Sequence, residues 1–228
     1  MAINIKNIKS NKAPKNPIDP GTYPARLVQV IGLGLQPQRP YQGQEKPPAE
    51  EIMLTYELVD EFMLDDEGNE QEDKPRWISE TLPLYGLNSE KAKSTLRYLV
   101  LDPNMEKEGD FGALLGTPVN VTVVNNVSKD VVYSNVGAIS AMRKKDADNC
   151  PDLKNEAKVF DTENPDMEVF AKLPEWIQDK IKGNLNFKGS DLEKALNGAA
   201  PKKEEPKQKP KKNREAPPAD AEDDDVPY

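Results

Sequence analysis

Alternation of apolar and polar side chains between residues 21 and 140 constrains the fold of this chain more than any other feature. An extended strand points successive side chains to opposite faces, so an alternating run predicts a strand with one buried face. The first strand is expected over Gly21–Leu35. Gly32 and Gly34 interrupt it, and glycines inside a strand are typical of a bulge or a strong bend.

The same alternation predicts more strands. In the second, Tyr56 is expected in the core and Glu57 on the outer face. In the third, Ile78 and Leu82 share one face, so Trp77 is expected to point outward. The four further strands are expected over Glu50–Val59, Arg76–Leu84, a run that opens at Pro118, and Val131–Ser140.

A helix is expected between the third and fourth strands, from Glu90 to Leu101, with Asn88 or Ser89 as its cap. Its apolar face is expected at Ala92, Leu96, Leu99 and Val100. Three strands, a helix and two strands make the order of an OB-fold, a five-stranded Greek-key barrel bridged by one helix. The predicted class is therefore mainly β with an OB-fold barrel. Other antiparallel sheets with one helix share this order and stay open as an alternative.

Composition divides the chain into four parts. Only 36% of the residues are hydrophobic and 21 are prolines, so part of the chain is expected to remain unpacked. We predict a flexible basic arm over residues 1–19, an OB-fold domain over 20–145 and a helical appendage over 146–198. Short helices are expected in the appendage at 174–182 and 190–196, the first with Trp176, Ile177 and Ile181 as its apolar stripe. Residues 199–228 are expected to form a disordered linker and acidic tail.

The residue types argue against catalysis. The chain has no histidine and a single cysteine, Cys150, which excludes Ser-His or Cys-His nucleophiles and the usual zinc sites. A carboxylate magnesium site is possible in principle, but the acids from Asp60 to Glu67 surround a predicted solvated hairpin turn. We therefore expect no enzyme, no metal and no cofactor. The chain shows no membrane-spanning or signal-peptide segment, and its single cysteine suits a reducing compartment, so a cytoplasmic location is expected.

The formal net charge of -9 argues at first against a nucleic-acid partner. The charge is unevenly distributed, however. Residues 1–56 carry seven Lys or Arg against four Asp or Glu, while the acids concentrate in the segment 57–73, after residue 146 and in the tail. A basic stripe on an acidic protein is therefore possible.

The C-terminal residues Asp223, Asp224, Asp225, Val226, Pro227 and Tyr228 form an anionic run that ends in an aromatic residue. Such a segment cannot fold alone, and its chemistry fits a partner with a hydrophobic socket rimmed by Lys or Arg. It resembles the Asp-Asp-Asp-Ile-Pro-Phe tip of bacterial single-stranded DNA-binding proteins. With the linker and the strand order, the chain resembles the phage-encoded members of that group. Tyr in place of Phe and the acidic body depart from the pattern.

The resemblance implies coating of single-stranded DNA (ssDNA) in replication or recombination, and recruitment of replication or recombination proteins by the tip. It also implies that the chain works in the bacterial host cytoplasm. OB-folds bind such strands on the outer face of strands two and three, through stacking aromatics and cations. The candidate DNA-binding residues are Trp77, Arg76, Arg26, Arg39, Tyr41, Lys46, Tyr85, Lys129 and Arg143. A second hypothesis, a protein–protein adaptor or inhibitor that does not bind nucleic acid, accounts equally well for the acidic body.

Overall fold

Six strands and a few short helices make up the part of the chain that the structure describes. The computed structural model describes residues 17–40, 42–128 and 131–198. The strands are β1 (Gly21–Gln36), β2 (Ala49–Leu64), β3 (Glu70–Pro83), β4 (Pro118–Ser128), β5 (Val131–Ala141) and β6 (Lys158–Phe160). The helices are α1 (Lys93–Leu101), a 3-10 turn at Gly112–Leu114, α2 (Lys144–Asp148), α3 (Met167–Ala171), α4 (Glu175–Lys182) and α5 (Asp191–Leu196).

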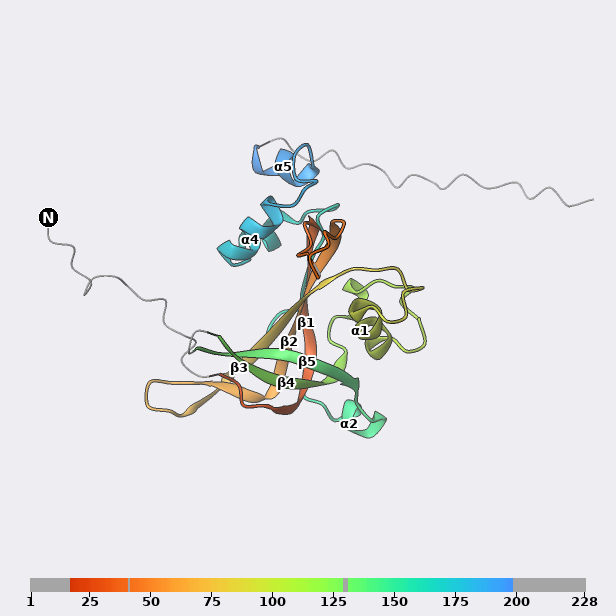
Figure 1. Cartoon of the computed structure of the whole chain (residues 1–228). Coiled ribbons are helices and arrows are strands. Elements are labelled where there is room, and N and C mark those ends of the chain that lie inside the picture. The colour runs from red at the N-terminus through yellow and green to blue at the C-terminus, as the bar shows by residue number, and fades with distance from the viewer. Residues whose placement is uncertain (1–16, 41, 129–130, 199–228) are drawn as a thin grey trace, which may run out of the picture.

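The strands form one sheet in the order β3-β2-β1-β4-β5 (Figure 1). These five strands pair antiparallel, and β6 adds to β1 in parallel over Gln29–Ile31. The mainly β class is confirmed. The predicted count of five strands is wrong, because the three-residue β6 was too short to show alternation. The end strands β3 and β5 lie in contact, but in the described residues no ladder joins them.

Strand β1 is long and bent, as its glycines predict. Its pairing with β2 shifts register between Leu27 and Gln29 and again between Gly32 and Gly34. Gly34 has φ +74°, a left-handed conformation that glycine adopts without steric cost. A Cβ atom there would lie 2.7 Å from Cγ of Asn184, so glycine also permits a close approach of the C-terminal segment.

The inner core lies on the concave side of the sheet and contains Ala25, Leu27, Leu54, Tyr56, Leu58, Ile78, Leu82, Tyr98, Val119, Val121, Val136 and Ile139. Tyr56, Ile78 and Leu82 are buried as expected. Ile18 also belongs to this core: its N–H donates to Oγ of Ser134, and its carbonyl accepts from Nδ2 of Asn125. Within the described residues, the expected arm is therefore already packed at Ile18.

The predicted apolar face of α1 is wrong. Leu96 and Leu99 are 49% and 40% exposed, and the helix instead buries Ser94, Thr95, Arg97, Tyr98 and Leu101. The helix begins at Lys93, with Ala92 at the N-cap and no side-chain cap. Two interactions explain this face: Tyr98 fills the inner core, and the Arg97 guanidinium turns toward a buried carboxylate on β3.

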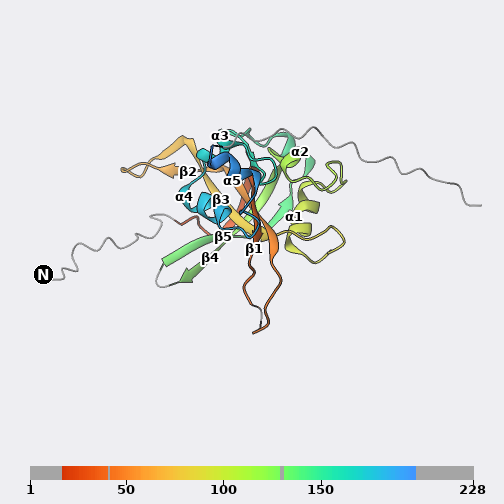
Figure 2. The ribbon, with the colours of Figure 1, turned by 90° about the horizontal axis from the view of Figure 1, so that it is seen from above.

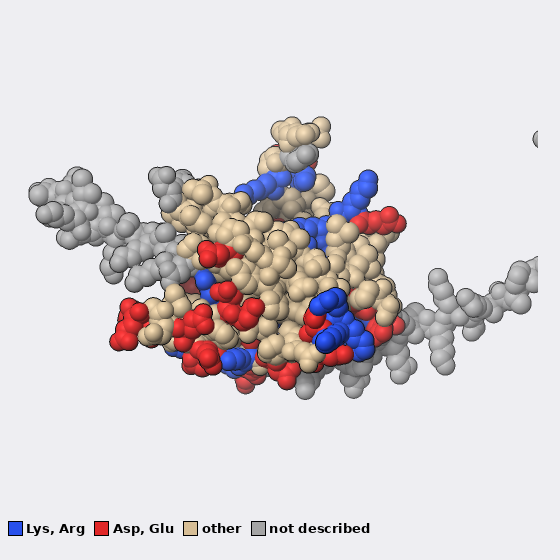
Figure 3. All heavy atoms as spheres, turned by 90° about the horizontal axis from the view of Figure 1, so that it is seen from below, with Lys and Arg blue, Asp and Glu red and all other residues tan. Residues whose placement is uncertain are grey.

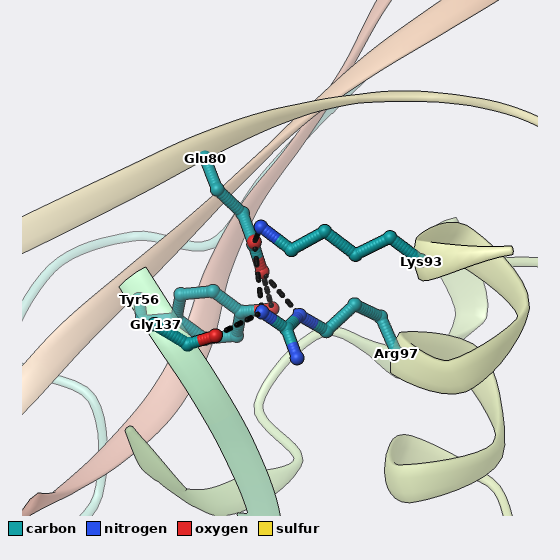
Figure 4. A network of polar contacts seen from close by, with 5 residues as sticks. All are labelled: Tyr56, Glu80, Lys93, Arg97 and Gly137. Atoms are coloured by element: carbon teal, nitrogen blue, oxygen red, sulfur yellow. Dashed lines mark hydrogen bonds and ion pairs between the residues drawn. The ribbon is translucent and has the colours of Figure 1, made fainter. Parts of the chain in front are cut away.

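That carboxylate, Glu80, centres a polar network between β3, β5 and α1 (Figure 4). Arg97 donates from Nε and Nη2 to the two Glu80 oxygens, at 2.8 and 3.1 Å, and from Nη2 to the Gly137 carbonyl at 3.3 Å. Lys93 Nζ lies 2.9 Å from Glu80 Oε2, and the Tyr56 hydroxyl donates to Oε1. Burial, and then the Glu80 charge, raise the pKa of Tyr56 far above its usual value. Arg97 thus bridges the two end strands where backbone pairing is missing.

The C-terminal segment forms an outer core against the convex side of the sheet. It brings Phe160, Phe170, Leu173, Ile177, Ile181 and Leu192 onto Ile31, Leu33 and Met53 of β1 and β2. Figure 2 shows α3, α4 and α5 gathered over the strands. The two predicted helices are present as α4 and α5, and Ser190 Oγ caps α5. Trp176 lies outside its predicted stripe and is 60% exposed, because Ile177 and Ile181 alone face the sheet.

Candidate nucleic-acid interface

The outer face of β2 is covered by the C-terminal segment. Met53, Thr55 and Glu57 on this face are only 3%, 1% and 1% exposed. The open surface expected over the second and third strands is therefore reduced to the outer face of β3 and the β1–β2 loop next to it. Sequence alternation alone could not show this, because it identifies an outer face without saying what packs on it.

Glu57 fastens the covering segment beside Trp77. Its carboxylate accepts from the backbone N–H of Lys154 at 2.7 Å and from Nδ2 of Asn155 at 2.7 Å. It also accepts from Nε1 of Trp77 at 3.1 Å. A buried carboxylate requires such donors, since burial without them is costly. The indole is thereby held at a fixed place on the edge of the covered region.

Trp77 opens a strip of outward side chains along β3. It is 38% exposed, and Ser79 and Thr81 follow on the same face while Ile78 and Leu82 point into the core. With a rise of about 3.3 Å per residue, Trp77 to Thr81 spans roughly 13 Å. The predicted outward position of Trp77 is confirmed. An exposed aromatic followed by hydroxyl side chains suits a stacked base and its sugar-phosphate.

A groove continues the strip at its Thr81 end. Its volume is about 580 Å³, and it lies between the β1–β2 loop, β3 and α4. It is lined by Gln36, Pro37, Gln38, Arg39, Pro40, Lys46, Glu51, Thr81 and Lys180. Thr81 belongs to both the strip and the groove, which makes the two surfaces continuous.

The groove carries more positive than negative side chains: Arg39, Lys46 and Lys180 against Glu51. Glu51 is held at its wall, where Oε2 lies 2.7 Å from Lys180 Nζ and Oε1 accepts from Gln38 Nε2 at 2.9 Å. Two of these cations, Arg39 and Lys46, were predicted from the sequence. The groove has the charge and the hydrogen-bond donors that a phosphate chain needs.

Arg26 is used for structure. Its guanidinium donates to the carbonyls of Gly116, Cys150 and Pro151, and lies 3.4 Å from a carboxylate oxygen of Asp152. Only 16% of its side chain is exposed. It therefore ties the start of the C-terminal segment to β1, and we leave it out of the proposed interface.

Arg76 and Trp77 point to opposite faces of β3, because strand alternation places Arg76 with Ile78. Arg76 lies among acids: its charge lowers the pKa of Glu61, although burial of Glu61 is the larger effect and raises that pKa overall. Asp60 and Glu70 act on the same carboxyl group. Figure 3 shows acidic side chains on this end of the molecule. Arg76 is thus separated from the strip.

Two other predicted residues lie away from the groove lining. Tyr85 is 48% exposed just after β3, and its backbone N–H donates to Ser94 Oγ at the start of α1. Arg143 precedes α2 and pairs with Asp146, with Nε 2.6 Å from Oδ2. The hydrogen bond to Asp146 raises the pKa of Arg143. Figure 3 shows basic and acidic side chains intermixed on the end of the molecule that carries α2.

Tyr41, Lys129 and the tip Asp223–Tyr228 lie outside the described residues. The sequence interpretation missed one cation of the groove lining, Lys180. Lys180 carried no local signal, because only the packing of α4 brings it to the β1–β2 loop.

Within the described ranges, no group of three or more His, Cys, Asp or Glu side chains is placed to hold a metal ion. Among the helices described, none is long and apolar enough to cross a bilayer. No protein-family model and no curated protein matches the sequence.

Proposed function

We propose that the sheet is the OB-fold barrel of a sequence-independent ssDNA-binding protein. Two features support the fold. The strand order β3-β2-β1-β4-β5, with α1 between β3 and β4, is that of the OB Greek key. The contact between β3 and β5 brings the two ends of the sheet together, and the Arg97 bridge replaces the missing ladder at this seam.

The continuity of the β3 strip with the basic groove carries the functional proposal. Trp77 offers a ring for stacking, Thr81 offers a hydroxyl, and Arg39 and Lys46 offer charge where the strip ends. The Ser79 hydroxyl between them lies 2.9 Å from Oγ1 of Thr55 and keeps a further hydrogen-bonding position. This sequence of groups follows the repeating base and phosphate of a single strand. Because none of these groups recognises a particular base edge, the binding is expected to be independent of sequence.

The acidic body limits where DNA can bind and leaves the positive groove as its path. Acids such as Glu61 and Glu70 around Arg76 repel a phosphate chain from that end of the sheet. By the resemblance of the tip, Asp223–Tyr228 recruits replication or recombination proteins to coated phage DNA in the host cytoplasm.

Binding of a labelled oligo-dT by the full chain at roughly 50 and 200 mM salt tests the proposal. Replacing Trp77 by Ala removes the stacking ring and should weaken binding about 5- to 150-fold, since stacking contributes on the order of 1–3 kcal/mol per base. Trp77→Phe keeps a ring and is the matched control, expected close to wild type. Glu57 keeps its bonds to Lys154 and Asn155 in both variants, so both should fold.

A wild-type chain that binds no oligo-dT at either salt concentration contradicts this proposal and favours the adaptor. Equal binding by Trp77→Ala and wild type contradicts the assignment of the strip. Where binding is observed, the proposal also requires the affinity to fall as the salt concentration rises, because phosphate contacts release counterions.

A further inference from the structure

We propose that α4 is the second wall of the ssDNA groove, with Lys180 contacting a phosphate and Trp176 stacking on a base. This inference rests on the proposed function and extends it to an element outside the five-stranded sheet. In this proposal the C-terminal segment both covers β2 and forms part of the binding site.

The placement of α4 is fixed from both sides of the helix. Ile177 and Ile181 are 2% and 0% exposed and anchor it to the outer core. At its end, the Lys180 carbonyl accepts from Nε2 of Gln36 at 3.0 Å, and Gln36 is itself buried at the end of β1. The Leu35 carbonyl accepts from the Leu185 N–H at 2.9 Å. Lys180 is thus held at the groove by backbone contacts that do not involve its charge.

Trp176 and Lys180 lie on one flank of α4. Four residues separate them, so their side chains neighbour each other one helical turn apart. Trp176 is 60% exposed, and 34% of the Lys180 side chain is exposed. A tryptophan this exposed forfeits much of the free energy that burial of its ring provides. A base from a strand lying in the groove would cover it, since the neighbouring Lys180 already lines that groove.

Glu51 keeps Lys180 in place before DNA arrives. The ammonium group has three donor hydrogens, and the 2.7 Å contact with Glu51 uses only part of them. A phosphate can therefore bind Lys180 from the groove side. The Glu51 carboxylate also repels that phosphate, so its charge works against DNA while it positions the lysine.

These opposed roles give a test with opposite signs. Lys180→Ala should weaken oligo-dT binding about tenfold at low salt and reduce the log–log salt slope by about 0.7, the value for one phosphate on a single strand. Glu51→Gln should tighten binding, because it removes a negative charge from the groove. An ion pair that only stabilised the fold would make both variants weaker, and that result would overturn the proposal.

Lys182 supplies the matched control on the same helix. It lies on the opposite flank, 3.6 Å from Asp179 and over the Phe170 ring, and is 39% exposed. Lys182→Ala should bind like wild type with an unchanged salt slope. An equal loss in Lys180→Ala and Lys182→Ala would show a general charge effect and contradict the assignment.

Trp176 can be followed directly, because the chain has two tryptophans. In Trp77→Phe the remaining indole is Trp176, and oligo-dT should quench its emission. Emission that stays unchanged when labelled oligo-dT has saturated this variant would refute stacking on α4 while leaving the proposed function intact. No binding by wild type would instead refute the proposed function itself.

Discussion

Replacing Arg97 by Met tests whether the polar seam between β3 and β5 holds the sheet together. Met keeps much of the side-chain length but removes both bonds to Glu80 and the bond to the Gly137 carbonyl. Breaking a buried ion pair typically costs about 3–5 kcal/mol, because the other charge is left buried. Glu80 would keep Lys93 and Tyr56 as partners, so we expect the lower end, about 3 kcal/mol.

Urea unfolding of the full chain measures this cost as a lower midpoint, and thermal unfolding as a Tm lower by roughly 6–12 °C. Lys93→Ala is the control: its side chain is 49% exposed, so its loss should cost at most about 1 kcal/mol. Adding Glu80→Gln to Arg97→Met removes the negative charge of Glu80 that has lost its Arg97 partner, and should restore part of the stability. A cost below about 1 kcal/mol for Arg97→Met would refute a structural role for the seam.

Two further perturbations probe the C-terminal segment and the pH dependence. Ile181→Ala removes a fully buried side chain from the outer core and should lower the free energy of unfolding by about 2–5 kcal/mol, measured by urea unfolding. Hydrogen exchange should show the largest loss of amide protection in α3 to α5, and a uniform loss of protection over the whole sheet would contradict a separate outer core. Burial raises the pKa of Asp102, but hydrogen bonds from the N–H groups of Lys107 and Glu106 outweigh it, so the pKa is lowered. A lowered pKa stabilises the fold above the unfolded value of about 4 and loses that contribution as pH falls through the folded pKa. Asp102→Asn should therefore flatten the loss of stability in acid, and an unchanged acid profile would contradict this.

The strand pattern was readable because one face of each strand is buried by the sheet itself. Ile78 and Leu82 face the core and Trp77 faces outward, and Gly32 and Gly34 mark the second of the two register shifts of β1. The prediction failed for α1, where the exposed Leu96 and Leu99 were taken for the buried face. Helical periodicity ranks side chains by polarity, and it could not foresee that a buried carboxylate would draw Arg97 inward.

The candidate site divides in the same way. Arg39, Lys46 and Trp77 were predicted from residue type and strand alternation, whereas Arg26 could not be distinguished from a DNA contact until its carbonyl partners were known. Lys180 and Trp176 lie more than a hundred residues from the β1–β2 loop, and only the packing of α4 brings Lys180 into the groove.

By itself, the sequence determined the mainly β class, the succession of the five long strands along the chain and the outward position of Trp77. These follow from local periodicity, which depends on where each side chain stands relative to its own strand. Tertiary structure alone decided that β2 is covered, that Arg97 bridges β3 and β5, and that α4 borders the groove. Those features depend on contacts between residues distant in the chain, and local periodicity carries no information about such contacts.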